Sequence, residues 1–339
     1  MYYKNVYKYD DMKRGEHMAV RNTFGWYFWT HHLVEVKGPD AAALLDRIAT
    51  GRIANLKIGS ARYTTMLNEQ AEIIDDTVIF RMDEELFWVS TLFAHKLIPW
   101  LESHKDGVQA EIARITEQWD MYAVQGPKSL DVINALVTTP VDDLKFFTIR
   151  DNEIEGIPVK INRAGFTGEK YGYEIYVAPQ HNAVIESKLK EAEALFGGKQ
   201  VTEFQIMAWT LPTEAGFYYM RDLMHTNPLE VGLDRGIGWD KEFIGKEALL
   251  KIKEEGAKRE MVGFTVPQAD IQINGKHMGG PGDPVLLNGE EVGRVSKITY
   301  GYVTEQNIGY ILADKGALKI GDKVMIHGYE GVITDKVFL

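Results

Sequence analysis

Apolar and polar residues alternate with two distinct spacings in the first part of the chain. Short runs with a period of two are typical of strands, and longer runs with apolar residues every three or four positions are typical of helices. The first predicted segments are a strand at 34–39, a helix at 40–48, strands at 62–67, 73–80 and 86–91, and a helix at 95–104. This pattern predicts one compact lobe that mixes helices and strands.

The same order of elements occurs a second time. A strand phrase beginning at Tyr122 ends in Gly126-Pro127, as the first one ends in Gly38-Pro39. The segments that follow are a helix at 128–137, strands at 146–149, 157–162 and 173–177, and a helix at 182–196. Each half has its own apolar faces, so we predict two tandem ferredoxin-like (β-α-β-β-α-β) lobes, over about residues 30–117 and 118–225.

Helical spacing disappears beyond Met261. Short β-rich runs follow, and Asn288-Gly289 between two of them predicts a tight hairpin, because both residues readily adopt positive φ. A charged helix reaching Glu255 connects this part to the rest. The sequence therefore predicts an α+β fold, with two lobes in residues 1–257 and a C-terminal β-barrel domain in residues 258–339.

Composition narrows the classes of partner. The formal net charge of −11 repels nucleic-acid phosphates and anionic membranes. Cysteine is absent from the sequence, which excludes disulfides, thiolate metal sites and thiol nucleophiles and suits a reducing compartment. No stretch has a signal-peptide core or the roughly 18 uncharged apolar residues of a membrane span. We expect a cytoplasmic protein with no nucleic-acid, membrane or metal partner.

Three polar phrases are candidates for chemistry. Asp75 and Asp76 begin an otherwise apolar strand, so one carboxylate should face inward and require a partner. Residues 162–174 contain glycines that free the backbone for close approach to a flat ligand, without phosphate-loop spacing. Glu214 is a lone acid in an aromatic run. Taken separately, each has an ordinary alternative: a solvated turn acid, a glycine-rich hairpin and an ion-pair member.

The order of these phrases is more specific than any one of them. Further phrases at 18–22, 63–69, 227–233 and 243–249 complete a series that resembles the aminomethyltransferase family, the glycine-cleavage T-protein and its relatives. The resemblance covers nearly the whole chain. It implies a three-lobed cloverleaf of two related α+β units and a β-barrel, around a central channel that holds tetrahydrofolate.

The resemblance also implies roles for individual residues. Asp76 matches the family aspartate beside the folate nitrogens that carry the one-carbon unit, where a carboxylate can orient folate or accept a proton. Glu214 matches the glutamate that binds the donor edge of the pterin. Tyr63 matches a tyrosine of the same pocket, and Arg163 with Tyr171 lies near the folate tail. Asp75 is then a structural or solvent-facing neighbour.

The departures from the family pattern concern the donor. Residues 26–31 are strongly aromatic where the family carries an acid, and 212–215 lack the family arginine. Retained folate anchors with changed neighbours suggest a tetrahydrofolate-dependent demethylase that takes a methyl group from a small O- or N-methylated substrate. Trp26, Tyr27 and Trp29 are the expected substrate pocket, through stacking or cation–π contacts. His31 or Tyr218 is the candidate proton donor to the leaving group.

Other readings stay open. A glycine-cleavage aminomethyltransferase would use the same Asp76 and folate but would accept its substrate from lipoylated H-protein. A non-catalytic folate-binding assembly protein is a third reading, although such relatives typically carry a cysteine-containing phrase. A partner protein with a lipoyl or corrinoid group is compatible with an enzyme of this kind.

Overall fold

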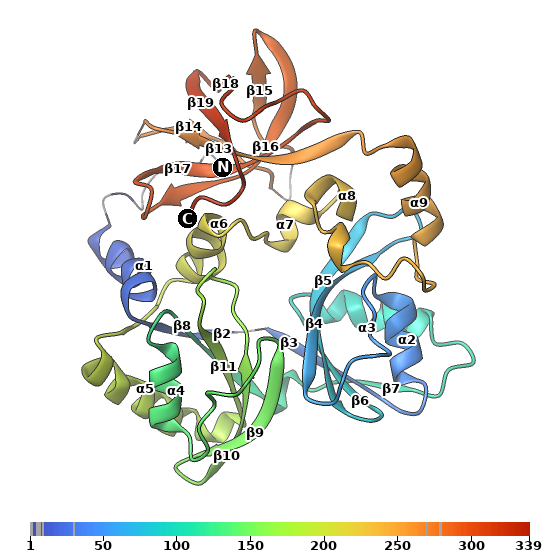
Figure 1. Cartoon of the computed structure of the whole chain (residues 1–339), viewed down its shortest axis with the longest axis vertical. Coiled ribbons are helices and arrows are strands. Elements are labelled where there is room, and N and C mark those ends of the chain that lie inside the picture. The colour runs from blue at the N-terminus through green and yellow to red at the C-terminus, as the bar shows by residue number, and fades with distance from the viewer. Residues whose placement is uncertain (1–2, 5–7, 9, 30, 269, 278–279) are drawn as a thin grey trace.

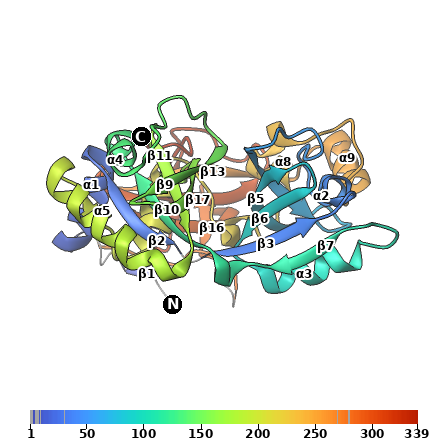
Figure 2. The same cartoon turned by 90° about the horizontal axis from the view of Figure 1, so that it is seen from below.

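The molecule has three lobes (Figure 1). The computed structural model describes residues 3–4, 8, 10–29, 31–268, 270–277 and 280–339. The β-barrel lies at the top of the view and the two α+β lobes lie below it; seen from below, the same two lobes are side by side (Figure 2). The α+β class, the C-terminal barrel and the cloverleaf arrangement are confirmed.

The first lobe follows the predicted order of elements. It consists of β3 (His32–Lys37), α2 (Ala41–Ile48), β4 (Ser60–Leu67), β5 (Ile73–Asp83), β6 (Leu86–Thr91), α3 (Ala94–Ser103) and β7 (Glu111–Arg114). Leu44, Leu45 and Ile48 occupy one face of α2 and are buried against the sheet. The helical spacing read from the sequence therefore reflects burial of one helix face.

The second lobe repeats the first. It consists of β8 (Asp120–Gln125), α4 (Ser129–Leu136), β9 (Thr148–Ile154), β10 (Ile157–Arg163), β11 (Gly172–Val177), α5 (Asn182–Phe196) and β12 (Lys199–Gln200). In both lobes three strands separate the two helices, one more than in the six-element unit. The repeated glycines, Gly38 and Gly126, have φ of +138° and +124°. A Cβ would lie 2.4 Å from a backbone oxygen at either, so both turns require glycine.

The two lobes share one sheet. Its strand order is β12-β2-β8-β11-β10-β9-β4-β5-β6-β3-β7, and Ser60 of β4 pairs with Thr148 of β9 at the junction. The helix α1 (Asp11–Asn22) and the strand β2 (Gly25–Trp29) precede the first lobe in sequence, yet β2 pairs with β8 of the second. The sequence repeat did not predict this placement. The strands β2 and β3, which follow one another in sequence, thus belong to different lobes.

The connecting segment and the barrel complete the fold. The short helical elements are 3₁₀ turns at Thr116–Gln118, Pro179–His181 and Asp234–Gly236, a π-helical turn at Ile206–Thr210, α6 (Leu211–Glu214), α7 (Met220–Leu223) and α8 (Pro228–Val231), before the longer α9 (Lys246–Glu255). The remaining strands are β1 (Tyr3–Lys4), β13 (Arg259–Val266), β14 (Gln272–Ile273), β15 (Pro284–Leu287), β16 (Glu290–Gly301), β17 (Gln306–Asp314), β18 (Lys323–Ile326) and β19 (Tyr329–Thr334).

The barrel is closed by six strands in the order β13-β17-β16-β15-β18-β19. The predicted hairpin joins β15 to β16, with φ of +54° at Asn288 and +89° at Gly289, as a two-residue primed turn requires. Throughout the described part of the chain, no helix has the length and apolar character needed to cross a membrane. A cytoplasmic location stays a prediction.

Candidate functional site

Asp76 and Tyr63 form a hydrogen-bonded pair on neighbouring strands. β5 carries Asp76 and β4 carries Tyr63, and the Tyr63 hydroxyl donates to Asp76 Oδ2 at 3.0 Å. Burial raises the pKa of Asp76 to about 6, and the Tyr63 hydrogen bond opposes this rise. Burial and the neighbouring Asp76 charge raise the pKa of Tyr63 well above its usual value, so Tyr63 keeps its proton. Asp76 can therefore gain or lose a proton near neutral pH.

Asp75 points to the opposite face of β5, as strand alternation requires. Its side chain is only 5% exposed, which excludes the solvent-facing role and leaves the structural one. The Thr91 hydroxyl donates to Asp75 Oδ2 at 2.6 Å. Burial raises the pKa of Asp75 to about 7. The acid pair thus consists of a buried carboxylate, Asp75, and a half-buried one, Asp76, each with its own hydrogen-bond partner.

The raised pKa values make stability depend on pH. A carboxyl whose folded-state pKa lies above its ordinary value binds more protons in the folded state, so it lowers stability as pH rises through that window. For Asp75 the window runs from its ordinary value of 3.8 to about 7. Between pH 5 and pH 8, Asp75 should lower the unfolding free energy of the wild type by about 2–3 kcal/mol. The Asp75→Asn variant lacks this carboxyl, so its unfolding free energy should fall by that much less. Urea unfolding at both pH values measures this, and equal losses would contradict the assigned shift.

Glu214, at the end of α6, is fully buried and already has four protein hydrogen-bond donors. Its Oε2 accepts from His17 Nε2 at 2.9 Å and from Arg21 Nε and Nη2 at 3.0 and 2.8 Å. Its Oε1 accepts only from the Val303 backbone N–H, at 3.0 Å. Burial acts to raise the pKa of Glu214, but His17 and Arg21 outweigh it and lower that pKa, so Glu214 is ionised.

These contacts limit which oxygen of Glu214 could bind the pterin, as the resemblance predicts. A bidentate pairing through both oxygens would need Oε2 to be released by Arg21 and His17. Oε1 accepts one hydrogen bond and has a second lone pair for a pterin N–H. The folate role of Glu214 therefore stays a prediction, now centred on Oε1. Sequence reasoning missed His17 and assigned no function to Arg21; the phrase at 18–22 was the available signal.

Arg163 and Tyr171, predicted near the folate tail, lie together in the second lobe. The Arg163 guanidinium carbon is 5.4 Å from the centre of the Tyr171 ring. Arg163 Nη1 also donates to the Leu144 carbonyl at 2.8 Å. The contact with Tyr171 and the hydrogen bond to Leu144 hold the Arg163 guanidinium at the end of β10.

The aromatic residues of β2 divide between two faces. Trp26 is fully buried in the core of the second lobe, where its Nε1 donates to Glu193 of α5 at 2.7 Å. Trp26 therefore cannot line a substrate pocket in this structure, because alternation along the strand directs it away from Tyr27 and Trp29. Those two rings share the other face, with centres 5.7 Å apart.

Two rings that the sequence did not single out extend this face. Phe166 lies 4.7 Å from the Trp29 ring centre, and Phe204 stacks on Trp29 at 5.6 Å. Tyr27 and Trp29 thus lie in one aromatic group with Phe166 and Phe204, and their role as a substrate pocket stays a prediction.

Charged side chains from α7 and β16 lie next to these aromatic rings. Tyr219 lies 6.3 Å from Phe204 and 6.0 Å from Trp209, measured between ring centres. The remaining members contact Trp209 or one another. We call the five residues Trp209, Tyr219, Arg221, Asp222 and Lys297 the α7 cluster.

The α7 cluster lies within electrostatic reach of the acidic pair. The Asp222 charge raises the pKa of Asp76, after burial and hydrogen bonding have had their larger effects. Burial raises the pKa of Tyr219 most, and the charges of Asp76 and Asp222 raise it further. Sequence reasoning missed the cluster, although Lys297 in the middle of an apolar strand was a usable signal.

His31 and Tyr218, the candidate proton donors, occupy different environments. Burial lowers the pKa of His31 to about 4, so its imidazole is neutral at pH 7, and its Nε2 has no hydrogen-bond partner among the described residues. The Tyr218 hydroxyl donates to the Val231 carbonyl at 2.8 Å and accepts from Lys336 at 2.7 Å. Burial raises the pKa of Tyr218, so its proton is held. Both catalytic roles stay predictions.

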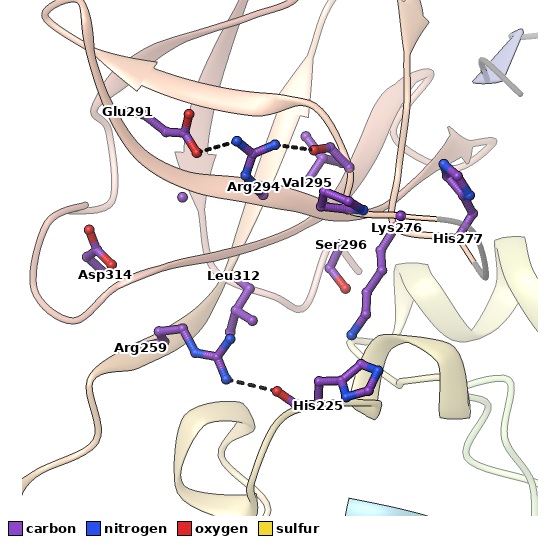
Figure 3. Close-up of a pocket in the computed structure, with 14 residues that line it drawn as sticks. His225, Arg259, Lys276, His277, Glu291, Arg294, Val295, Ser296, Leu312 and Asp314 are labelled. Carbon is purple, nitrogen blue, oxygen red and sulfur yellow. Dashed lines mark hydrogen bonds and ion pairs between the residues drawn. The ribbon is translucent and has the colours of Figure 1, made fainter. Parts of the chain in front are cut away.

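Two openings lie near these groups. A cavity of about 150 Å³ is lined by Tyr63 and by the turn that includes Arg235. A larger pocket of about 680 Å³ lies between the barrel and the segment after α7 (Figure 3). Its positive side chains already have protein partners: Arg259 contacts Glu230 at 2.7 Å, and Arg294 contacts Glu291 at 2.8 Å. The described residues include no group of three His, Asp or Glu side chains placed to hold a metal ion.

Comparison with known proteins agrees with this architecture. The GCVT N-terminal domain family matches residues 1–241, and the glycine cleavage T-protein C-terminal barrel domain family matches residues 259–338. An aminomethyltransferase of Thermotoga petrophila is 30% identical over 96% of this chain and 86% of its own length. One from Thermoanaerobacter sp. is 32% identical over 92% and 84%.

A solved structure shares the fold. The glycine cleavage system aminomethyltransferase T from Bartonella henselae superposes with a TM-score of 0.84 at 23% identity, covering 96% of this chain and 89% of that one. Both family profiles and the full-length relatives lead to one assignment. The chain belongs to the glycine-cleavage T-protein, or aminomethyltransferase, family and is an enzyme of the folate-dependent one-carbon transferase class.

Proposed function

We propose that this enzyme transfers a one-carbon unit to tetrahydrofolate at Asp76. The observation that carries the proposal is the half-buried Asp76 carboxylate, whose pKa is raised to about 6 and whose Oδ2 accepts a hydrogen bond from Tyr63. Tetrahydrofolate would supply the amine that accepts the carbon. Asp76 Oδ1 is then left to orient that amine and to accept the proton that it loses as the new C–N bond forms.

The residues that would hold the folate fit its chemistry. Glu214 Oε1 has acceptor capacity for an N–H at the pterin edge, and Tyr63 lines an opening beside Asp76. Arg163, held over Tyr171, offers a positive charge for the carboxylates of the tail. The helix α7 contacts the strand β5, so the segment that follows Glu214 lies close to the strand that carries Asp76.

The donor that the relatives favour is an aminomethyl group on a lipoyl-bearing carrier protein. In that reaction the C–S bond to the carrier breaks, the carbon passes to folate as a methylene group, and ammonia and the free carrier thiol leave. No oxidant is required. The similar full-length proteins are aminomethyltransferases, so aminomethyl transfer is our first candidate.

A small methylated donor is the second candidate, and the aromatic face favours it. Tyr27, Trp29, Phe166 and Phe204 form a face that suits a flat or cationic molecule. Here the bond from the methyl carbon to oxygen or nitrogen breaks, the folate N–CH₃ bond forms, and the proton accepted by Asp76 passes to the leaving group. This exchange also balances without a redox partner.

One experiment separates the two donors. Purified enzyme and tetrahydrofolate are incubated with aminomethylated H-protein, or with a panel of aryl methyl ethers and methylated amines, and the folate product is identified by mass spectrometry. Methylenetetrahydrofolate from the carrier supports the first candidate, and methyltetrahydrofolate from a small donor supports the second. If neither class yields a folate product that is lost in Asp76→Ala, the proposed function is wrong.

A further inference from the structure

The side chains of Thr65 and Asp76 lie on the same face of two neighbouring strands. The two residues are direct partners in the register of β4 and β5. Directly opposed residues of an antiparallel pair have Cβ atoms about 4.5–5.5 Å apart. Tyr63, two positions earlier on β4, shares that face and donates to Asp76 Oδ2 at 3.0 Å. Asp76 therefore has two hydroxyl-bearing neighbours, both from β4.

Threonine hydroxyls connect this face to the loop that follows α2. Thr50 Oγ1 lies 3.0 Å from Thr65 Oγ1 and 3.3 Å from Thr64 Oγ1. Thr64 Oγ1 also accepts from the Gly51 backbone N–H at 2.8 Å. All three threonine side chains are buried. A hydroxyl donates one hydrogen bond and accepts others, so each can take a proton on one side while it releases its own on the other.

The three threonines border the cavity of about 150 Å³ that Tyr63 also lines. The other wall of this cavity is the turn at 232–236, where Gly232, Arg235 and Gly236 are exposed, so the cavity reaches the surface. Sites for drug-sized ligands usually measure roughly 300–1,000 Å³, so this cavity is too small to hold a whole folate. It has room for several waters of about 30 Å³ each, and its hydroxyl lining offers them hydrogen bonds.

Methylene transfer from an aminomethyl carrier requires such a connection. Two folate N–H bonds are replaced by two bonds to the methylene carbon, so two protons leave the folate nitrogens. The Asp76 carboxylate accepts one proton at a time. The first proton must therefore leave Asp76 before the second arrives. Because the amine occupies the Oδ1 side of Asp76, the free route for that proton runs along β4.

We propose that Thr65 and Thr50 relay protons from Asp76 to the water of the cavity beside Tyr63. The Asp76 O–H bond breaks as its proton passes to water held by Thr65. Each hydroxyl then gains one proton and releases its own, and the last O–H bond forms on cavity water, which exchanges with solvent. The carrier thiolate and the departing amine each gain one proton from solvent, which balances the two that folate loses. Thr65 and Thr50 act through Asp76 and not on the substrate.

That the relayed proton comes from folate rests on the first candidate of the proposed function. The relay itself is measured without any transfer, by ¹³C NMR of enzyme labelled at its aspartate carboxyl carbons. Spectra are recorded near pH 6, where Asp76 is half-protonated, with tetrahydrofolate bound and no donor present. The Asp76 signal is identified by its loss in Asp76→Asn. Rapid proton exchange with solvent should give one sharp Asp76 signal in the wild type.

Thr65→Val keeps the shape of the side chain and removes the hydroxyl. It should slow the proton exchange by roughly tenfold or more and broaden or split the Asp76 signal, and Thr65→Ser should restore the sharp signal. Thr50→Val interrupts the next step and should have the same effect; if Thr65→Val fails to fold, Thr50→Val decides alone. Because both residues lie on one path, combining the two substitutions should slow exchange no more than the slower single variant does.

The matched control is Thr77→Val. Thr77 is as buried as Thr65 but lies on the opposite face of β5, and its hydroxyl has no hydrogen-bond partner within the part of the chain that the structure describes. This variant should give the wild-type signal. An unchanged Asp76 signal in Thr65→Val, equal broadening in the Val and Ser variants, or equal broadening in Thr77→Val would overturn the relay.

Single-turnover formation of methylenetetrahydrofolate from aminomethylated H-protein gives a second readout. Thr65→Val should lower this rate by roughly tenfold, and imidazole, a small proton carrier, should restore it while the affinity for folate stays unchanged. A loss of rate that imidazole does not restore would assign Thr65 a packing role and overturn the relay. Loss of activity in Asp76→Asn with full activity in Thr65→Val also overturns the relay alone. Full activity in Asp76→Asn overturns the proposed function instead.

Discussion

Asp76→Asn is expected to lower kcat for one-carbon transfer by roughly 10²–10⁴-fold, the range typical of removing a positioned general base. The amide has the shape of the carboxylate and can still accept the Tyr63 hydrogen bond of 3.0 Å. It cannot take the proton released by the folate amine. Because shape and that hydrogen bond are retained, the affinity for tetrahydrofolate should change far less than kcat. Initial rates of folate product formation and a folate titration measure the two quantities.

The neighbouring carboxylate provides the control. Asp75 is buried and its pKa is also raised, but its side chain lies on the other side of β5, where it accepts a hydrogen bond from Thr91. Asp75→Asn should keep kcat within a few-fold of the wild type. Similar losses in both variants would show that the substitutions act through the strand rather than through proton transfer. The Asp76 assignment would then be withdrawn.

Parts of the fold could be predicted because they depend on local conformational requirements. Gly38 and Gly126 follow equivalent strands, at turns that require glycine. The repeat can therefore be recognised in the sequence from these two positions. Asn288-Gly289 likewise specifies its hairpin. The pairing of β2 with the second lobe depends instead on contacts between distant segments. No local spacing carries that information.

The site was predictable to a similar degree. The Tyr63–Asp76 pair follows from phrases close together in sequence, whereas Arg21 and Glu214 are separated by 193 residues. The aromatic run at 26–29 predicts a single aromatic patch, and this prediction is wrong for Trp26, which lies in the core of the second lobe. The period of two along a strand already separates it from Tyr27 and Trp29. The sequence assigns no role to Lys297, because its position 4.4 Å from the centre of the Trp209 ring depends on contacts between the barrel and a distant segment.

Glu214→Leu is expected to destabilise the protein by about 3–5 kcal/mol, the usual cost of removing one member of a buried ion pair. Glu214 is fully buried and receives hydrogen bonds from His17, Arg21 and the Val303 backbone. Leucine fills a similar volume but leaves the Arg21 guanidinium without its main counter-charge. Urea unfolding at pH 7 measures the loss.

Two matched variants identify the cause of that loss. Glu169 contacts the same guanidinium at 2.5 Å and its side chain is 14% exposed; Glu169→Leu should cost less stability than Glu214→Leu, because Glu214 still neutralises Arg21. Arg21→Met combined with Glu214→Leu removes both of these charges and leaves only Glu169, the more exposed of the two acids, without its partner. Replacing a buried ion pair with apolar groups is often nearly neutral. The double variant should therefore regain much of the stability lost by Glu214→Leu alone. If it is no more stable than the single variant, the destabilisation arises from packing around α6 and not from the uncompensated charge of Arg21.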